Sequence, residues 1–272
     1  MRMKYTLCAL VFASLTFSVP AFAETPKRIV SLAPNITEIL FALGLEDRIV
    51  AVTSFCDYPE GTEGKQKVGG MSNPSLERVV SLQPDMVIMT TDGNPKAFAE
   101  RLASFRVKTY IFRTRTLSEL PRGIRLMGSV LDVRGKADKL AADIETALKN
   151  LSHRITSVSQ RKKVLFVVWP EPLIVAGPGT AIDDAITLLG HSNIARGAQS
   201  SYPKYSLEEI MLQAPDVIFI GKGHADMRKM SQGFLDKISG TPAVRHHRVF
   251  FIGDNLYRLG PRIISGIEEI AT

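Results

Sequence analysis

Two glutamates stand at the same place in two copies of one sequence pattern. Glu77 is the second residue of LERVVSLQPDMVIM at positions 76–89, and Glu208 is the second residue of LEEIMLQAPDVIFI at positions 207–220. In both copies a helix-like stretch leads through Pro-Asp into a strand-like run, so each glutamate is expected in the first turn of a short helix. The helix dipole favours a carboxylate there.

The sequence lacks the motifs that would give these or other carboxylates a catalytic task. It contains no His-Glu-x-x-His and no Gly-x-Ser-x-Gly, and GPGT at 177–180 has neither the glycine spacing of a dinucleotide site nor the Lys-Ser/Thr of a P-loop. Asp183 and Asp184 fall where a helix is expected to start, which favours a capping role. We therefore expect no catalytic site, no metal site and no resident cofactor.

The first 23 residues, MRMKYTLCALVFASLTFSVPAFA, predict a secretory signal peptide that is cleaved after Ala23. Their apolar run, residues 7–19, is shorter than the roughly 18 to 20 residues that span a bilayer. Without Arg2 and Lys4, the 34 basic side chains fall to 32 against 27 acidic ones, a net charge of about +5 with no basic stripe. We expect an exported, periplasmic protein that binds no nucleic acid. Cys56 is the one cysteine left, so no intramolecular disulfide can form.

Strands and helices alternate along the first half of the mature chain, which predicts a parallel sheet covered by helices. The first helix shows apolar residues at spacings of three and four and stops at Gly44, with Asn35 or Thr37 as its expected cap. The expected strands are 28–32, 48–53, 86–90 and 108–112, and the expected helices are 33–44, 76–82 and 95–105.

Residues 117–160 break this alternation. They contain no strand-like run, and Leu140, Ile144, Leu148 and Leu151 follow helical spacing. This predicts one long helix, preceded by a second helix that ends near Gly128 or Gly135.

The second half repeats the order of the first, with offsets that drift between 131 and 146 residues. Strands are expected at 163–169, 216–221 and 248–253, and helices at 181–190, 206–213 and 227–238. Duplication of one fold explains this order better than chance similarity. We predict an α/β protein of two parallel-sheet lobes joined by a single long helix, with a ligand cleft between the lobes. The expected segments are 1–23 (signal peptide), 24–127 (N-terminal lobe), 128–160 (interlobe helix) and 161–272 (C-terminal lobe).

Five segments carry a resemblance to a known family. They are RIVSLAPNITEILFALG, TSFCDYPEG, VGGMSNPSLERVVSLQPDMVI, YSLEEIMLQAPDVIFIG and YRLGPRI. They resemble the periplasmic substrate-binding proteins of ABC importers for vitamin B12, haem and ferric siderophores, with the vitamin B12 binders nearest, over residues 28–270. The resemblance implies a monomer with its ligand between the lobes, and it implies that Glu77 and Glu208 form salt bridges with arginines of the permease dimer. The two lobes, each with one glutamate, would then match the twofold symmetry of the permease dimer.

The resemblance also implies a set of ligand-binding residues for a corrinoid, a large, flat and partly apolar molecule. These residues are Pro34, Asn35, Phe55, Met71, Trp169, Tyr202, Asp254 and Arg258. Met71 and Thr90 stand where aromatic rings would be expected of a vitamin B12 binder. That departure leaves room for another cobamide or a corrinoid precursor as the transported ligand.

Other ligands and another class of protein remain open. Haem would use an axial Tyr or His, for which Tyr58 and Tyr202 lie in suitable loops. A ferric siderophore is anionic and would use cleft arginines, with Arg258 as the first candidate and Arg113 and Arg115 as weaker ones. A receptor that senses the ligand without transport would share the cleft but would not need Glu77 and Glu208.

Overall fold

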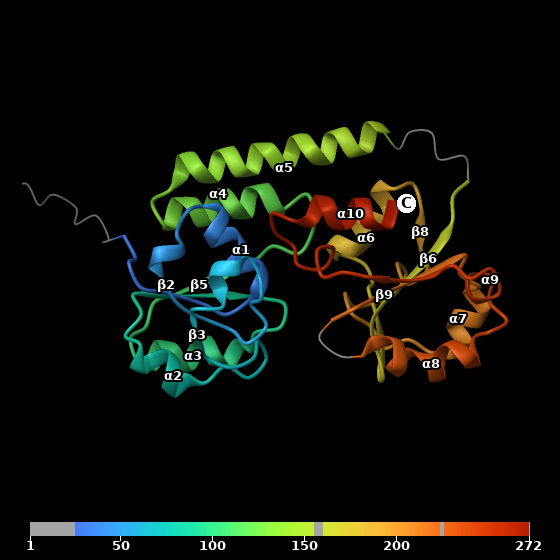
Figure 1. Cartoon of the computed structure of the whole chain (residues 1–272), viewed down its shortest axis with the longest axis horizontal. Helices are drawn as coiled ribbons and strands as arrows, with labels where there is room; N and C mark the ends of the chain where they lie inside the picture. The colour runs from blue at the N-terminus through green and yellow to red at the C-terminus, as the bar shows by residue number, and fades with distance from the viewer. Residues whose placement is uncertain (1–24, 155–159, 224–225, 272) are drawn as a thin grey trace, which may run out of the picture.

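The structure, a computed structural model of the chain, describes residues 25–154, 160–223 and 226–271. It has two α/β lobes side by side, with one long helix across the top of both (Figure 1). The predicted signal peptide lies outside the described residues. Among the described residues, no helix is both long enough and apolar enough to cross a membrane.

The N-terminal lobe is built on a parallel five-stranded sheet in the order β3-β2-β1-β4-β5. Its elements are β1 (Ile29–Ser31), α1 (Pro34–Ala42), η1 (Glu46–Arg48), β2 (Ile49–Val52), η2 (Glu60–Thr62), β3 (Gln66–Lys67), α2 (Leu76–Ser81), β4 (Met86–Thr90), α3 (Lys96–Ser104) and β5 (Thr109–Phe112). Helices α2 and α3 lie below the sheet, and α1 lies above it with α4 (Leu120–Val130) (Figure 1).

The C-terminal lobe repeats this plan around β6, with the strand order β10-β9-β6-β7 and β8 also paired to β6. Its elements are β6 (Lys163–Pro170), β7 (Leu173–Val175), α6 (Ala181–Leu188), β8 (Ser192–Asn193), α7 (Leu207–Gln213), β9 (Val217–Gly221), α8 (Met227–Lys237), α9 (Pro242–Arg245), β10 (Val249–Ile252) and α10 (Ile263–Ala271). The strand β7 runs antiparallel to β6, so this sheet is mixed.

The repeated Pro-Asp pattern has a structural role that is the same in both lobes. Asp85 follows α2 and accepts a hydrogen bond from the backbone N–H of Arg28 at 2.8 Å; Asp216 follows α7 and accepts one from Lys163 at 2.8 Å. The side chains of Arg28 and Lys163 donate back to carbonyls at the ends of α2 and α7. Each aspartate therefore ties a helix end to the start of its lobe's central strand, which explains why the pattern occurs twice.

The glutamates of the repeat do not cap their helices. Ser75 and Ser206 are the N-caps of α2 and α7, and their hydroxyls accept hydrogen bonds from the N–H of Arg78 and Glu209. The expected cap of α1 is wrong: Ala33 is the N-cap residue, without a side-chain hydrogen bond. Pro34 opens this helix, because its fixed φ and missing N–H suit the first position.

The long helix α5 (Arg134–Arg154) begins later than residue 128. Gly128 does not end the preceding helix; it lies inside α4, where a Cβ would approach the Cβ of Ala137 to 2.1 Å. This glycine allows α4 and α5 to pack closely. Of the predicted interlobe segment 128–160, residues 155–159 lie outside the described residues.

The two lobes are joined by more than α5. One buried apolar cluster includes Ile29 and Phe112 of the N-terminal lobe together with Ile182 and Ile267 of the C-terminal lobe. The backbone N–H of Leu117 also donates to a side-chain oxygen of Asp184, 2.9 Å away. Relative motion of the lobes would disturb close-packed apolar side chains, which costs free energy.

We expect the free and ligand-bound proteins to have nearly the same overall dimensions. Bending α5 would break backbone hydrogen bonds, and opening the lobes would expose the shared core. Small-angle scattering with and without ligand measures this directly. A radius of gyration that falls by several Å when ligand is added would show that the single-helix connection between the lobes is not rigid.

Candidate ligand-binding cleft

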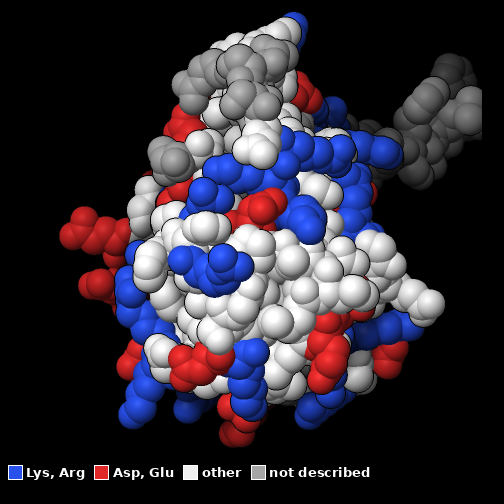
Figure 2. Space-filling model, turned by 90° about the vertical axis from the view of Figure 1, so that its right-hand side faces the viewer, with Lys and Arg blue, Asp and Glu red and all other residues white. Residues whose placement is uncertain are grey.

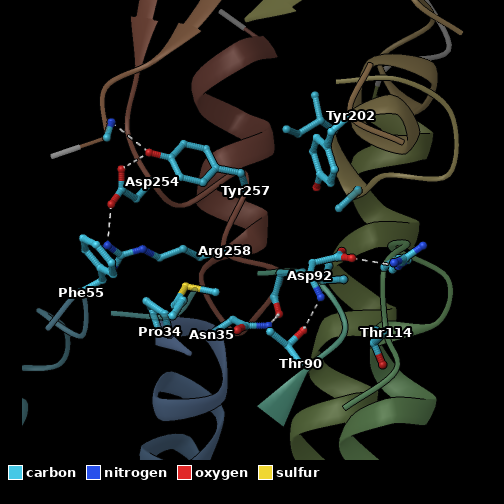
Figure 3. Close-up of a pocket in the computed structure, with 16 residues that line it drawn as sticks. Pro34, Asn35, Phe55, Thr90, Asp92, Thr114, Tyr202, Asp254, Tyr257 and Arg258 are labelled. Carbon is cyan, nitrogen blue, oxygen red and sulfur yellow. Dashed lines mark hydrogen bonds and ion pairs between the residues drawn. The ribbon is translucent and has the colours of Figure 1, made fainter. Parts of the chain in front are cut away.

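A cavity of about 240 Å³ lies between the lobes, at the carboxyl ends of the parallel strands (Figure 3). The start of α1 and the segments after β2, β3, β4 and β5 form one wall. The start of α6 and the loops after β8, β9 and β10 form the other. The cavity brings together seven of the eight predicted ligand residues, namely Pro34, Asn35, Phe55, Met71, Tyr202, Asp254 and Arg258. This is the position at which α/β proteins hold small ligands.

Trp169, the eighth predicted residue, does not line this cavity. It lies near the end of β6, which continues to Pro170 and turns back into β7. Its indole Nε1 donates to the carbonyl of Glu171 at 2.7 Å, so the ring lies over the turn of the hairpin. The sequence predicted a strand that ends at Trp169, whereas β6 continues to Pro170 and forms a hairpin with β7 that was not predicted.

Arg258 is the centre of a cluster of charges at one end of the cavity. Its side chain is only 7% exposed. It donates two hydrogen bonds to Asp57, one of which is 3.1 Å long, and one to Asp254 at 2.5 Å. Burial alone would lower the pKa of Arg258, but the hydrogen bond to Asp57 and the charges of Asp254, Asp57 and Glu38 raise it above its usual value. Its charge is therefore matched by carboxylates of both lobes.

A second ion pair beside Arg258 also connects the lobes. Glu38 of α1 is buried and accepts two hydrogen bonds from Arg262, at 2.9 Å and 2.5 Å. The Arg262 guanidinium lies 4.0 Å from the centre of the Tyr58 ring, a cation–π contact. The Asn35 amide donates to the carbonyl of Leu259 at 3.4 Å. Together these contacts attach the segment after β10 to the N-terminal lobe.

Tyr257 lies at the same end of the cavity and is not among the ligand residues predicted from the sequence. Its hydroxyl donates to Asp254 and accepts a hydrogen bond from the N–H of Gly223 at 3.0 Å (Figure 3). Burial, and then the bond to Asp254, raise the pKa of this phenol. One backbone turn, closed by a bond from Arg258 N–H to Asp254 carbonyl, places all three side chains together. The spacing of three and four residues after Asp254 was the signal that could have found Tyr257.

The opposite end of the cavity carries a second set of polar groups. Asp92 forms an ion pair with Arg115 at 2.9 Å, and the hydroxyl of Tyr202 points toward them in Figure 3. Burial raises the pKa of Asp92 in spite of the opposing effect of Arg115. Burial, followed by the charge of Asp92, raises the pKa of Tyr202 to about 12. The phenol of Tyr202 is therefore protonated at neutral pH.

Glu77 and Glu208 lie outside the cavity, in the first turns of α2 and α7, and both are exposed. Figure 1 places these helices at the lower side of the two lobes, away from α5. Within the described residues, neither carboxylate forms an ion pair. The described part of the chain also holds no group of three or more His, Cys, Asp or Glu residues that could bind a metal ion.

Two α/β lobes with a cavity between them, lined by loops of both, define a two-lobed solute-binding protein. The family model described as "Periplasmic binding protein" matches residues 29–256, and the chain belongs to this family. Its members bind solutes for transport and are not enzymes.

Three relatives show how far the similarity extends. The chain is 29% identical to the vitamin B12-binding protein of Vibrio parahaemolyticus, over 96% of this chain and 92% of that protein. It is 32% identical to an uncharacterized ABC transporter substrate-binding lipoprotein of Bacillus subtilis, over 91% of this chain and 80% of that protein. The periplasmic heme-binding protein of Roseiflexus sp. RS-1, in apo form, superposes with a TM-score of 0.80 at 27% identity, covering 90% of this chain and 96% of that one. The chain is a substrate-binding protein of the ABC importer class.

Proposed function

We propose that this protein captures a corrinoid, vitamin B12 or a related cobamide, in the periplasm and delivers it to the permease of an ABC importer. The observation that carries the choice of ligand is the complete pairing of Arg258 with Asp57 and Asp254. Because that cation is already neutralised, the cavity offers rings and hydrogen-bonding groups rather than free charge. A largely uncharged macrocycle with amide side chains suits such a lining. The similarity to a vitamin B12-binding protein supports the same choice.

The size of the cavity limits how a corrinoid could sit. At about 240 Å³ it is smaller than the roughly 300 to 1,000 Å³ of sites that enclose a whole small ligand. One edge of the macrocycle would occupy the cavity between Phe55 and Tyr202, and the rest would lie in its mouth. Asn35 and Asp254 line the cavity and would bond peripheral amides of the ligand.

Haem is the second candidate, and Tyr202 is the observation that favours it. The phenols of Tyr202 and Tyr257 line the cavity, whereas no described histidine does. The Tyr257 hydroxyl is already held by Asp254 and the N–H of Gly223, so Tyr202 is the available axial ligand. Iron binding would have to remove the phenolic proton of Tyr202, whose pKa is about 12. A ferric siderophore is less favoured, because its negative charge would compete with Asp57 and Asp254 for Arg258.

Titration with cyanocobalamin, cobinamide, haemin and a ferric siderophore tests the ligand class. We expect one corrinoid per protein, followed by the corrinoid's own visible absorption, because Trp169 does not line the cavity. Tyr202→Phe should keep corrinoid binding but remove the tyrosinate-to-iron absorption of any haemin complex. Tight binding of haemin or siderophore without a corrinoid signal would reject the proposal.

Delivery requires contact with the permease, and we propose that Glu77 and Glu208 make it as a pair. Both are exposed, both stand in the same turn of equivalent helices, and neither lines the cavity. The protein would act as a monomer that presents one glutamate on each lobe. A receptor that only senses ligand would not depend on these two side chains, so their replacement separates the two functions.

A further inference from the structure

The C-terminal lobe has a β-hairpin that the N-terminal lobe lacks. The central strand β1 has three residues and leads directly into α1, whereas its counterpart β6 has eight residues. The additional length turns at Glu171 and returns antiparallel as β7. Trp169, the one tryptophan of the chain, lies at this turn and is 36% exposed. The ligand cavity does not use this hairpin or its tryptophan.

A hollow of about 230 Å³ lies between the hairpin and the helices α7 and α8. Its apolar lining comes from Pro170, Leu173, Tyr205, Leu207, Met230 and Phe234. The Tyr205 hydroxyl donates to the carbonyl of Ile194 at 3.2 Å, which fixes its ring at the wall. The hollow is a separate site from the ligand cavity, because no residue lines both.

The hollow is next to the helix that carries Glu208. Leu207 lines it, and the same helix exposes Met211 to 44% and Leu212 to 78%. The equivalent positions of α2 hold Val80, which is half-buried, and Ser81. Exposed apolar groups that gather beside a pocket mark interaction surfaces more often than isolated ones do. The apolar surface around Glu208 therefore has no counterpart around Glu77.

We propose that this hollow receives an apolar side chain from a periplasmic loop of the permease, next to a basic residue that pairs with Glu208. The inference rests on the proposed function. Charge supports it: Glu171 lines the hollow, Glu208 stands in the first turn of the helix beside it, and Lys237 is the one cation among the residues that line the hollow. The lower edge of this lobe shows side chains of both signs (Figure 2), so a buried apolar anchor would add contact that charge alone does not supply. The two lobes would then bind a twofold permease unequally, which fixes the orientation of docking.

Gly233 offers a substitution that fills the hollow without damaging the fold. It is an exposed residue of α8 that lines the hollow, and a Cβ at this position would meet no atom within 4 Å. Leucine is also the better helix former, by up to about 1 kcal/mol. Gly135→Leu is the matched control, because Gly135 is likewise exposed and open. It belongs to α5, the helix that Figure 1 shows across the top of the molecule.

The experiment measures the affinity of the full-length mature protein for the importer's permease, with its ATPase subunits, in lipid nanodiscs. We expect Gly233→Leu to weaken docking at least tenfold, about 1.4 kcal/mol, and to leave ligand affinity within twofold. Gly135→Leu should dock like the wild type. Equal docking of Gly233→Leu and wild type would overturn the proposal while the glutamates keep their role.

Two other results would also be decisive. If the wild type shows no affinity for the permease, the proposed function falls and this inference with it. If sedimentation shows that the wild type dimerises and Gly233→Leu does not, a second copy of the chain occupies the hollow, and the assignment to the permease is overturned.

Discussion

Replacing Glu77 and Glu208 together by alanine is expected to abolish ligand uptake and to leave ligand affinity within about twofold, or roughly 0.4 kcal/mol. Both side chains are exposed and lie outside the cavity, so the ligand contacts persist. The helices also keep their Ser75 and Ser206 caps, and loss of an exposed first-turn carboxylate costs about 0.3 to 1 kcal/mol. An interface arginine left without its partner, by contrast, can cost several kcal/mol.

The measurement is uptake into vesicles that contain the reconstituted importer, beside ligand affinity in solution. The single variants should lie between the double variant and the wild type. Glu209→Ala is the matched control, because Glu209 is in the same turn but is held by a hydrogen bond from Gln213 at 3.0 Å. Loss of ligand affinity in the double variant would assign the glutamates to the cleft, and surviving uptake would reduce them to solvated helix charges.

The repeat made most of the fold predictable from the sequence. The Pro-Asp pair occurs in both halves because Asp85 and Asp216 each accept a hydrogen bond from the start of a central strand. A pattern of two neighbouring residues therefore indicates a tertiary contact. The strands next to it are short, continuous apolar runs, which are typical of buried parallel strands. Elements of two residues such as β3 and β8 carry no periodic signal and were not predicted.

Glycine and tryptophan gave the two misleading signals. Gly128 was a candidate helix end, yet it is required by the close approach of Ala137 on α5, a contact that no local pattern shows. Trp169 was expected among the ligand residues because of the family resemblance, at the end of the predicted strand 163–169. The structure pairs β6 with β7 in a hairpin, and Trp169 at its turn does not line the cavity.

The polar end of the cavity could be predicted only in part. Asp254 and Arg258 were expected on the basis of resemblance, but Asp57, the partner of Arg258, lies 201 residues away in the sequence. Spacing cannot show such a pair, because it forms when the segment after β10 packs on the N-terminal lobe. The same holds for Glu38 and Arg262, which are 224 residues apart.

That last pair gives the largest expected change in stability. Glu38→Gln should lower the free energy of unfolding by about 3 kcal/mol, the lower part of the range for breaking a buried ion pair, because Arg262 is itself 24% exposed. The Glu38 side chain is 1% exposed, and its second neighbour Arg258 lies 3.6 Å away. The neutral amide would leave the Arg262 charge without its partner and would place an NH₂ group against a donor.

Urea unfolding followed by circular dichroism measures the change, and Glu145→Gln is the control. Glu145 also takes two hydrogen bonds from one arginine, Arg125, at 2.6 Å and 2.9 Å, but both side chains are exposed. Exposed pairs contribute about 0 to 1 kcal/mol, so the control should change stability little. Because Glu38 joins α1 to the segment that carries Arg258, its replacement should also weaken ligand binding, whereas Glu145→Gln should not. Equal and small effects of the two variants would mean that the lobes are held by their shared apolar core and not by the charges at the end of the cleft.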